Sequence, residues 1–309
     1  MDITQFIDDT RYLLGVGFVR DSLIAAGLLG VLSGLMAPLV VLRRMSFAVH
    51  GTSELALMGA SAALLLSMNV GFGAVLGSIV AAIVLALLGM RQQDTAVGVV
   101  LSFGMGLSVL FIHLYPGRSS NAFSLLTGQI VGVQSSSVWL LAGVTALVTV
   151  AVLVFWRPIL FASADPQMAA AAGVNVHLVA VGFAVLVGLS AAEGVQIVGA
   201  LLVMALLITP GAAAVQVTSS PVRAVLLSTL FAEIAAVGGF VLSLAPGLPV
   251  SVFVTAISFF IYLVCRLIGY LRGRTAQRDE DAFRRRAQNG LQVIEEHMTG
   301  VSPRTGPSV

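Results

Sequence analysis

Residues 43–66 read RRMSFAVHGTSELALMGASAALLL, two arginines followed by an apolar stretch that carries a histidine and a glutamate. The apolar part, residues 47–67, has the length of about 20 residues that crosses a hydrocarbon core as a helix. In such a helix His50 and Glu54 stand at positions i and i+4, on one face and one turn apart. This spacing has two interpretations: a pair of metal ligands that address one point, or a hydrogen-bonded pair that satisfies both groups.

The composition of the whole chain predicts a membrane protein. Of its 309 residues, 58% are hydrophobic and 10% are charged, and its mean hydropathy is +1.02. Such a chain has too little polar material to cover a soluble globule. Much of the basic excess follows the last apolar segment, where it indicates membrane topology and not a nucleic-acid site.

The apolar segments predict an all-helical membrane bundle of eight or nine spans. Candidate spans are residues 22–42, 47–67, 70–90, 94–115, 137–156, 174–190, 193–216, 222–244 and 249–270. The segment 174–190 is short and almost joined to the next one, so a count of eight stays open. Nine alternating spans put Arg43, Arg44, Arg91, Arg157, Arg223, Arg266 and Arg272 on one side, and Arg11, Arg20 and Arg118 on the other. By the positive-inside rule, the N-terminus is then outside the cell and the C-terminus is cytoplasmic.

The polar tail and one cytoplasmic segment carry further expectations. We expect residues 1–271 to form the transmembrane domain, and the polar tail, residues 272–309, to be partly disordered. On the cytoplasmic side, ADPQMAAAAG predicts a short helix with Asp165 at its start, Pro166 in its first turn and Gly173 as its stop. This helix is either a surface that another subunit grips or an ordinary ordered loop.

The basic residues are all arginines, and the sequence contains no lysine. A phosphate-binding loop of the Walker type needs a lysine to reach the nucleotide phosphates. The chain therefore does not hydrolyse ATP through that motif. Energy for any transport must come from a partner or from a gradient.

Five stretches carry a resemblance to a known family. They are VVLRRMSF (40–47), DTAVGVVLSFGMGLSVLF (94–111), LLTGQI (125–130), ADPQMAAAAGV (164–174) and VQIVGALLVMALLITPGAAAVQVTSS (195–220). Together they resemble the membrane permeases of the zinc/manganese (ABC-3) family of metal-ion ABC importers, over nearly all of residues 20–270. The last stretch resembles the family's signature in length, in the placement of glycine and proline, and in flanking polarity.

The resemblance implies a complete importer in the plasma membrane. It implies a homodimer of two permease copies, two cytoplasmic ATPase subunits and an extracytoplasmic metal-binding protein, working by alternating access. The helix that starts at Asp165 would be the coupling helix that fits a groove on the ATPase. No permanently bound cofactor is implied, only a transported divalent metal, with zinc placed before manganese and iron.

The pair His50 and Glu54 departs from the family's pattern. Family members place an aspartate and, four residues later, a histidine in a motif close to GDALSHA.LPG, so the acid and the imidazole have changed places here. One imidazole and one carboxylate still share one helix face. A second copy of the chain would double them to two nitrogens and two oxygens, a set that suits Zn²⁺ and tolerates Mn²⁺ or Fe²⁺. We therefore predict that His50 and Glu54 are the transport site.

Three other ionisable residues are weaker candidates for the ion path. Glu233 lies deep in its span and must face a partner or water. Glu193 is expected near the outer boundary of its span, in contact with water or lining a gate. His113, at the outer end of its span, either feeds metal inward or snorkels to the interface.

Two other functions remain as alternatives. An intramembrane metalloenzyme would also place a histidine and a glutamate on one helix, but HGTSE lacks the glutamate next to the first histidine and the second histidine of HExxH. A permease for a chelated metal or another small solute could use the same scaffold, because the exchanged pair alters the site.

Overall fold

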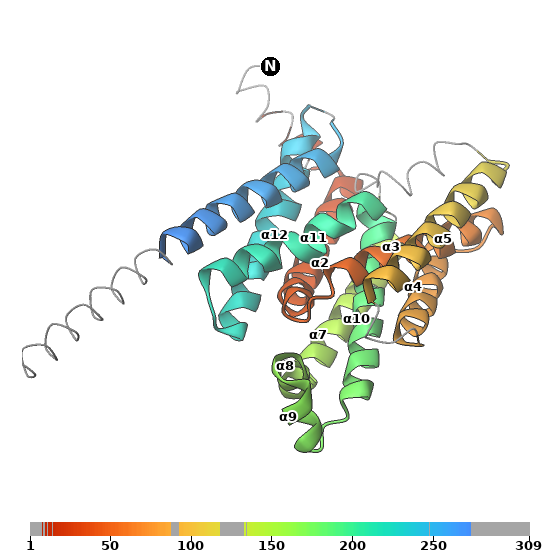
Figure 1. Ribbon diagram of the computed structural model, residues 1–309. Helices are drawn as coiled ribbons and strands as arrows, with labels where there is room; N and C mark the ends of the chain where they lie inside the picture. Colours follow the sequence, from red (N-terminus) through yellow and green to blue (C-terminus); the bar gives the residue numbers. More distant parts are fainter. Residues whose placement is uncertain are drawn as a thin grey trace, which may run out of the picture.

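The structure is a computed structural model that describes residues 8, 10, 12–13, 15–87, 93–117, 133, 135–246 and 248–272. The predicted polar tail lies outside these residues except for Arg272. The regular elements of the described part are helices, as expected (Figure 1). They are α2 (Gly17–Leu42), α3 (Ser46–Leu65), α4 (Val70–Leu87), α5 (Gln93–Leu114), α7 (Ser135–Val154), α8 (Trp156–Ala164), α9 (Pro166–Ala171), α10 (Val176–Val198), α11 (Ala200–Val217), α12 (Pro221–Leu244) and a final helix, Val250–Arg272.

Six helical segments in the described part of the chain are long and apolar enough to cross a membrane. They are Gly17–Leu42, Val97–Leu114, Ser135–Val154, Val176–Val198, Pro221–Leu244 and Val250–Arg272. Shorter apolar segments lie in α4 and α11. The helix α3 is in neither group, because its histidine, its glutamate and its small polar residues lower its hydropathy. The all-helical, multi-pass membrane fold is confirmed, whereas the count of eight or nine spans is not.

The helix α3 is enclosed by other helices. Its residues from Gly51 to Leu57 are all buried, and it packs against α4, α5, α10 and α11. Figure 1 shows α3 near the centre of the bundle, beside α4 and α5. Polar and ionisable side chains within a membrane normally face the interior of a bundle and not lipid. The central position of α3 therefore fits its low hydropathy.

Glycines let α4 approach α3 until their backbones touch. A β-carbon added at Gly59 would overlap the carbonyl oxygen of Gly73, and one added at Gly77 would overlap that of Leu55. The helices α2 and α12 meet in the same way, since a β-carbon at Gly34 would lie 2.8 Å from the backbone nitrogen of Thr229. Small residues of this kind permit close helix packing in lipid, where water supplies no driving force between helices.

The structure moves the predicted boundary between the sixth and seventh spans to Gly199. The sequence placed a short span at 174–190, but α10 is 23 residues long and ends at Val198. Only Gly199 separates it from α11, and its φ of 81° and ψ of 157° interrupt the helix. Glycine adopts a positive φ without the steric penalty that other residues meet. Glu193, which the prediction placed near the boundary between these spans, instead lies inside α10.

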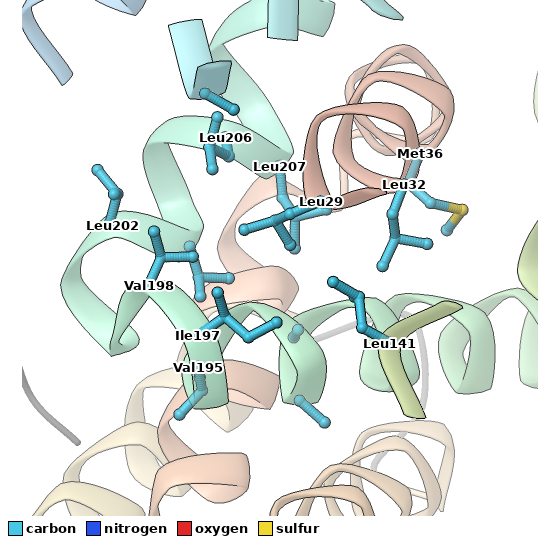
Figure 2. Packing of buried hydrophobic residues seen from close by; sticks show 14 of the residues in the cluster. Leu29, Leu32, Met36, Leu141, Val195, Ile197, Val198, Leu202, Leu206 and Leu207 are labelled. Atoms are coloured by element: carbon cyan, nitrogen blue, oxygen red, sulfur yellow. The ribbon is translucent and has the colours of Figure 1, made fainter. Parts of the chain in front are cut away.

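The main hydrophobic core lies where α2, α7, α10 and α11 meet. Figure 2 shows side chains of all four helices turned toward one another. The labelled residues are Leu29, Leu32, Met36, Leu141, Val195, Ile197, Val198, Leu202, Leu206 and Leu207. This core holds together the two helices on either side of Gly199 and thereby fixes the wall against which α3 packs.

Candidate metal site

The predicted pair lies on α3, where His50 is half-buried and Glu54 is only 6% exposed. The Nδ1 atom of His50 is enclosed and has no hydrogen-bond partner. Nearly all buried polar atoms in folded proteins have such a partner. The structure thus shows no hydrogen bond from this nitrogen to Glu54, and Nδ1 is in the state expected of an atom kept free for a ligand.

The polar residues between the pair are occupied by their own helix. Thr52 Oγ1 donates a hydrogen bond to the carbonyl oxygen of Val49 (2.9 Å), and Ser53 Oγ donates one to that of His50 (2.8 Å). Both hydroxyl groups are therefore satisfied locally within the buried helix. Of the four polar residues between positions 50 and 54, only His50 and Glu54 are left for an outside group.

The helix α5 presses against the turn that carries the pair. A β-carbon at Gly104 of α5 would lie 3.4 Å from the backbone carbon of Glu54, and one at Gly51 of α3 would lie 3.0 Å from Val97 of α5. The backbone from residue 51 to residue 54 therefore has little room to move toward α5. Such close support holds the turn with the two candidate ligands in a fixed position.

As metal ligands, the two side chains would be an incomplete set. Among the residues that the structure describes, no group of three or more histidine, cysteine, aspartate or glutamate side chains could hold a metal ion. Glu233, Glu193 and His113 are not brought together with the pair. Two protein ligands are half of a tetrahedral set, so a tight site needs groups from outside the described residues or from the cargo's own water.

The surroundings of Glu193 differ from the expectation of water contact. Its side chain is fully buried, at 0% exposed, and neither carboxylate oxygen has a hydrogen-bond partner. One turn on, Gln196 reaches α7 through Nε2, which donates to Ser137 Oγ (3.0 Å), while its Oε1 also lacks a partner. No local pattern could have predicted this contact, because 59 residues separate Ser137 from Gln196.

The other two weaker candidates lie apart from α3's pair. The carboxyl group of Glu233, on α12, rests against α2, where a β-carbon at Gly30 would lie 2.9 Å from Glu233 Oε1. Its interpretation as a residue that must face a partner is consistent with this contact. His113 is exposed in the last turn of α5.

The short helix predicted after Asp165 is confirmed as α9. Asp165 Oδ1 accepts hydrogen bonds from the backbone N–H groups of Gln167 and Met168, both at 3.0 Å, and Pro166 stands in the first turn. Gly173 follows the helix with a φ of 85°. Of the helix itself only Ala169 is buried. The helix therefore presents nearly all of its surface outward, as either expected role requires.

Comparison with known proteins shows to which family the chain belongs. The sequence profile of the ABC 3 transport family matches residues 16–269. The chain belongs to this family. The resemblance drawn from the five stretches is thereby confirmed, and the chain is an ABC transporter permease and not an enzyme, which removes the metalloenzyme alternative.

Individual relatives cover most of this ABC 3 family permease. The manganese transport system membrane protein MntC of Listeria innocua is 30% identical over 266 residues, which cover 84% of this chain and 95% of that protein. The manganese import system permease protein ScaB of Streptococcus parasanguinis is 29% identical over 265 residues, with 85% and 93% covered. Among solved structures, PsaBC from Streptococcus pneumoniae in complex with Fab matches with a TM-score of 0.76 and 26% identity, over 85% of this chain and 95% of that one.

One residue of this permease that the sequence treated only as a topology signal makes specific contacts. Arg43, at the end of α2, donates from Nε to Ser163 Oγ (2.8 Å) in α8, and its guanidinium carbon lies 4.6 Å from the ring centre of Phe183 in α10. A separation of 120 residues between Arg43 and Ser163 leaves no local pattern that could have predicted the contact.

Replacing Glu193 with glutamine should raise the unfolding temperature of the detergent-solubilised permease and leave its transport unchanged. A buried carboxylate without a partner is destabilising, whereas the amide has the same shape without the charge, so we expect a gain of about 1 kcal/mol or more in the free energy of unfolding. Thermal unfolding followed by tryptophan fluorescence measures the gain. Asp21→Asn is the matched control, because Asp21 accepts a hydrogen bond from Ser135 (2.7 Å) and its replacement should not stabilise. A loss of transport without a gain in stability would place Glu193 in the ion path instead.

Proposed function

We propose that this chain is the membrane permease of an ATP-driven importer of divalent metal ions, and that manganese is its preferred cargo. The observation that carries the proposal is the free Nδ1 of His50, one turn from the buried carboxyl group of Glu54, on an enclosed helix. An imidazole and a carboxylate without other partners are suited to a divalent transition metal. The sequence analysis placed zinc before manganese; relatives named for manganese transport support manganese as the cargo instead.

The metal is cargo, so a weak and incomplete site is an advantage. In the proposal, His50 and Glu54 of two copies of the chain face one path and together supply two nitrogens and two oxygens. Such a set binds in one state of the permease and is pulled apart in the other. A closed cage of four ligands within one chain would hold its ion too long for transport.

The partners in the proposal follow from what the chain lacks and from what it presents. Without a lysine for a Walker loop, the permease depends on separate cytoplasmic ATPase subunits. The exposed helix α9, with Asp165, Pro166 and Gly173 at its ends, is the coupling helix that contacts them. An extracytoplasmic metal-binding protein delivers the ion at the opposite side, and the permease works as a homodimer in the plasma membrane.

The proposed orientation has the N-terminus outside and the C-terminus in the cytoplasm, and contacts between helix ends support its grouping of these ends on one side. Arg43 joins the end of α2 to α8. In the same way Arg272, at the end of the final helix, donates from Nη1 to the carbonyl oxygen of Val217 at the end of α11 (3.1 Å). Both arginines belong to the set that the positive-inside rule puts in the cytoplasm, and each contacts an element that the proposal puts there too.

Uptake of radioactive manganese and zinc tests the proposal. The permease is expressed with its ATPase and binding-protein partners in cells that lack other manganese importers. We expect saturable manganese uptake that exceeds zinc uptake at equal concentration and disappears when the Walker lysine of the ATPase subunit is replaced. Accumulation of neither ion would overturn the proposal. Accumulation only in the presence of a chelator would favour the chelated-metal alternative.

A further inference from the structure

Arg43 connects three elements at one end of the bundle. It caps α2, donates to Ser163 in the last turn of α8, and lies over the ring of Phe183 in α10. Phe183 is 1% exposed and belongs to the main hydrophobic core. A planar guanidinium can donate a directed hydrogen bond and stack on an aromatic ring at once, which an ammonium group cannot do equally well. Arg43 is therefore held in one orientation and is more than a solvated positive charge.

On one side of Arg43 stands the segment that carries α9. Ser163 is two residues before Asp165, the cap of α9, and its hydroxyl group donates to the carbonyl oxygen of Ile159 within α8. Its oxygen thus accepts from Arg43 in a fixed position. Since only Ala169 of α9 is buried, α9 has little hold of its own on the bundle. A displacement of α9 must pass through the elements that flank it, α8 and α10, and Arg43 contacts both.

On the other side of Arg43 stands the helix with the candidate ligands. The turn from α2 to α3 is tight: Arg44 has a φ of 56°, and the backbone N–H of Met45 donates to the carbonyl oxygen of Val40 (3.0 Å). The helix α3 then begins at Ser46. His50 follows about 6 Å further along the helix axis, at 1.5 Å per residue. A movement of Arg43 therefore reaches the first turn of α3 through a short, hydrogen-bonded connection.

We propose that Arg43 is a positioning residue that links the position of α8 and α9 to the first turn of α3, and so to His50. The inference rests on the proposed function, in which α9 meets the ATPase and His50 holds the cargo. What it adds is the path by which movement passes from α9 to His50. The Ser163 hydroxyl group and the Phe183 ring hold the guanidinium, and the α2–α3 turn carries its movement to the candidate ligand. Removing Arg43 then separates ATP hydrolysis from transport without removing a metal ligand.

The test compares Arg43→Ala with Arg44→Gln in the complete importer, containing the ATPase subunits and the binding protein. Arg44 is the matched control, because it is the adjacent arginine in the same turn but is exposed. We expect Arg43→Ala to lower the maximal rate of manganese uptake roughly 2- to 30-fold, the range of mutations that weaken coupling between sites. The concentration of metal-loaded binding protein at half-maximal uptake should stay the same, and ATP hydrolysis should continue. Arg43→Lys should restore only part of the rate.

A second measurement does not depend on the cargo. In Arg43→Ala, amide hydrogen exchange should become faster in residues 159–168 and 43–50, whereas in Arg44→Gln it should not. Ser163→Ala removes one acceptor without disturbing the fold and should show the same change to a smaller degree, even if Arg43→Ala is poorly expressed. Equal uptake and equal exchange in the Arg43 and Arg44 variants, or no change in Ser163→Ala, would overturn the proposal. If the wild type imports no metal while exchange still responds to Arg43→Ala, the proposed function fails and the structural link stands.

Discussion

Replacing His50 or Glu54 with alanine should lower manganese uptake by at least about a hundredfold at equal membrane expression. Loss of a residue that merely orients a metal ligand reduces metal affinity by about 10- to 100-fold, so loss of a ligand should have at least the larger effect. In a symmetric pair of permeases each substitution removes two ligands at once. Initial uptake rates of radioactive manganese, normalised to the amount of permease in the membrane, measure the effect.

Controls must separate loss of a ligand from loss of packing. Glu54→Gln keeps the shape of the buried side chain and removes its charge, so it should also lose uptake while unfolding at or above the wild-type temperature. Thr52→Val lies within the same buried turn, and its hydroxyl group is satisfied by the carbonyl oxygen of Val49. It should transport at a rate close to that of the wild type. Wild-type uptake in both alanine variants would reduce the pair to a structural role and direct attention to Glu233.

The exchanged order of acid and imidazole permits a sharper experiment. The double variant His50→Asp with Glu54→His puts the acid first and the imidazole four residues later, as in the family's motif. Because one face of α3 still carries one imidazole and one carboxylate, we expect the double variant to keep a measurable part of the uptake that each single alanine variant loses. If it is as inactive as the alanine variants, the order of the ligands matters, and their shared face alone is not sufficient.

Helix positions could be predicted from the sequence because lipid imposes a length on apolar segments. The predicted span 222–244 corresponds to α12 (Pro221–Leu244), and the cap, proline and glycine around α9 are local signals that act over a few residues. The burial of Glu193 could not be predicted in this way. The prediction put it at the boundary of a span, whereas its small neighbours permit close packing that buries the carboxyl group completely.

The candidate site was predictable in part for the same reason. The positions i and i+4 on one helix guarantee that His50 and Glu54 share a face, whatever the rest of the chain does. The contacts of Arg43 with Ser163 and Phe183 depend on how distant helices pack, and one sequence carries no periodic signal for them. The remaining ligands of the metal are still a prediction, since they would belong to a second copy of the chain.

Gly77→Ala should strongly destabilise the packing of α4 against α3, close to the candidate site. A β-carbon at Gly77 would overlap the carbonyl oxygen of Leu55 and lie 3.1 Å from the Cα atom of Gly59. These are backbone atoms of α3, which cannot rotate away as a side chain would. The two helices must separate, and Leu55 moves together with its neighbour Glu54. Overpacking typically costs about 1–3 kcal/mol, and we expect about 3 kcal/mol or more here because a backbone must shift.

Gly106→Ala isolates the effect of this contact from that of adding a methyl group to a helix. Gly106 lies in α5 with nothing within 4 Å of an added β-carbon, so alanine there should be neutral or stabilise by up to about 1 kcal/mol through helix propensity. Thermal unfolding in detergent should place Gly77→Ala well below the wild type and Gly106→Ala at or above it, and uptake should be lost in the first variant alone. Should both variants unfold and transport like the wild type, α4 does not touch the backbone of α3. In that case α3 would have room to shift between its neighbours, and the position of His50 and Glu54 would be independent of the glycine contacts.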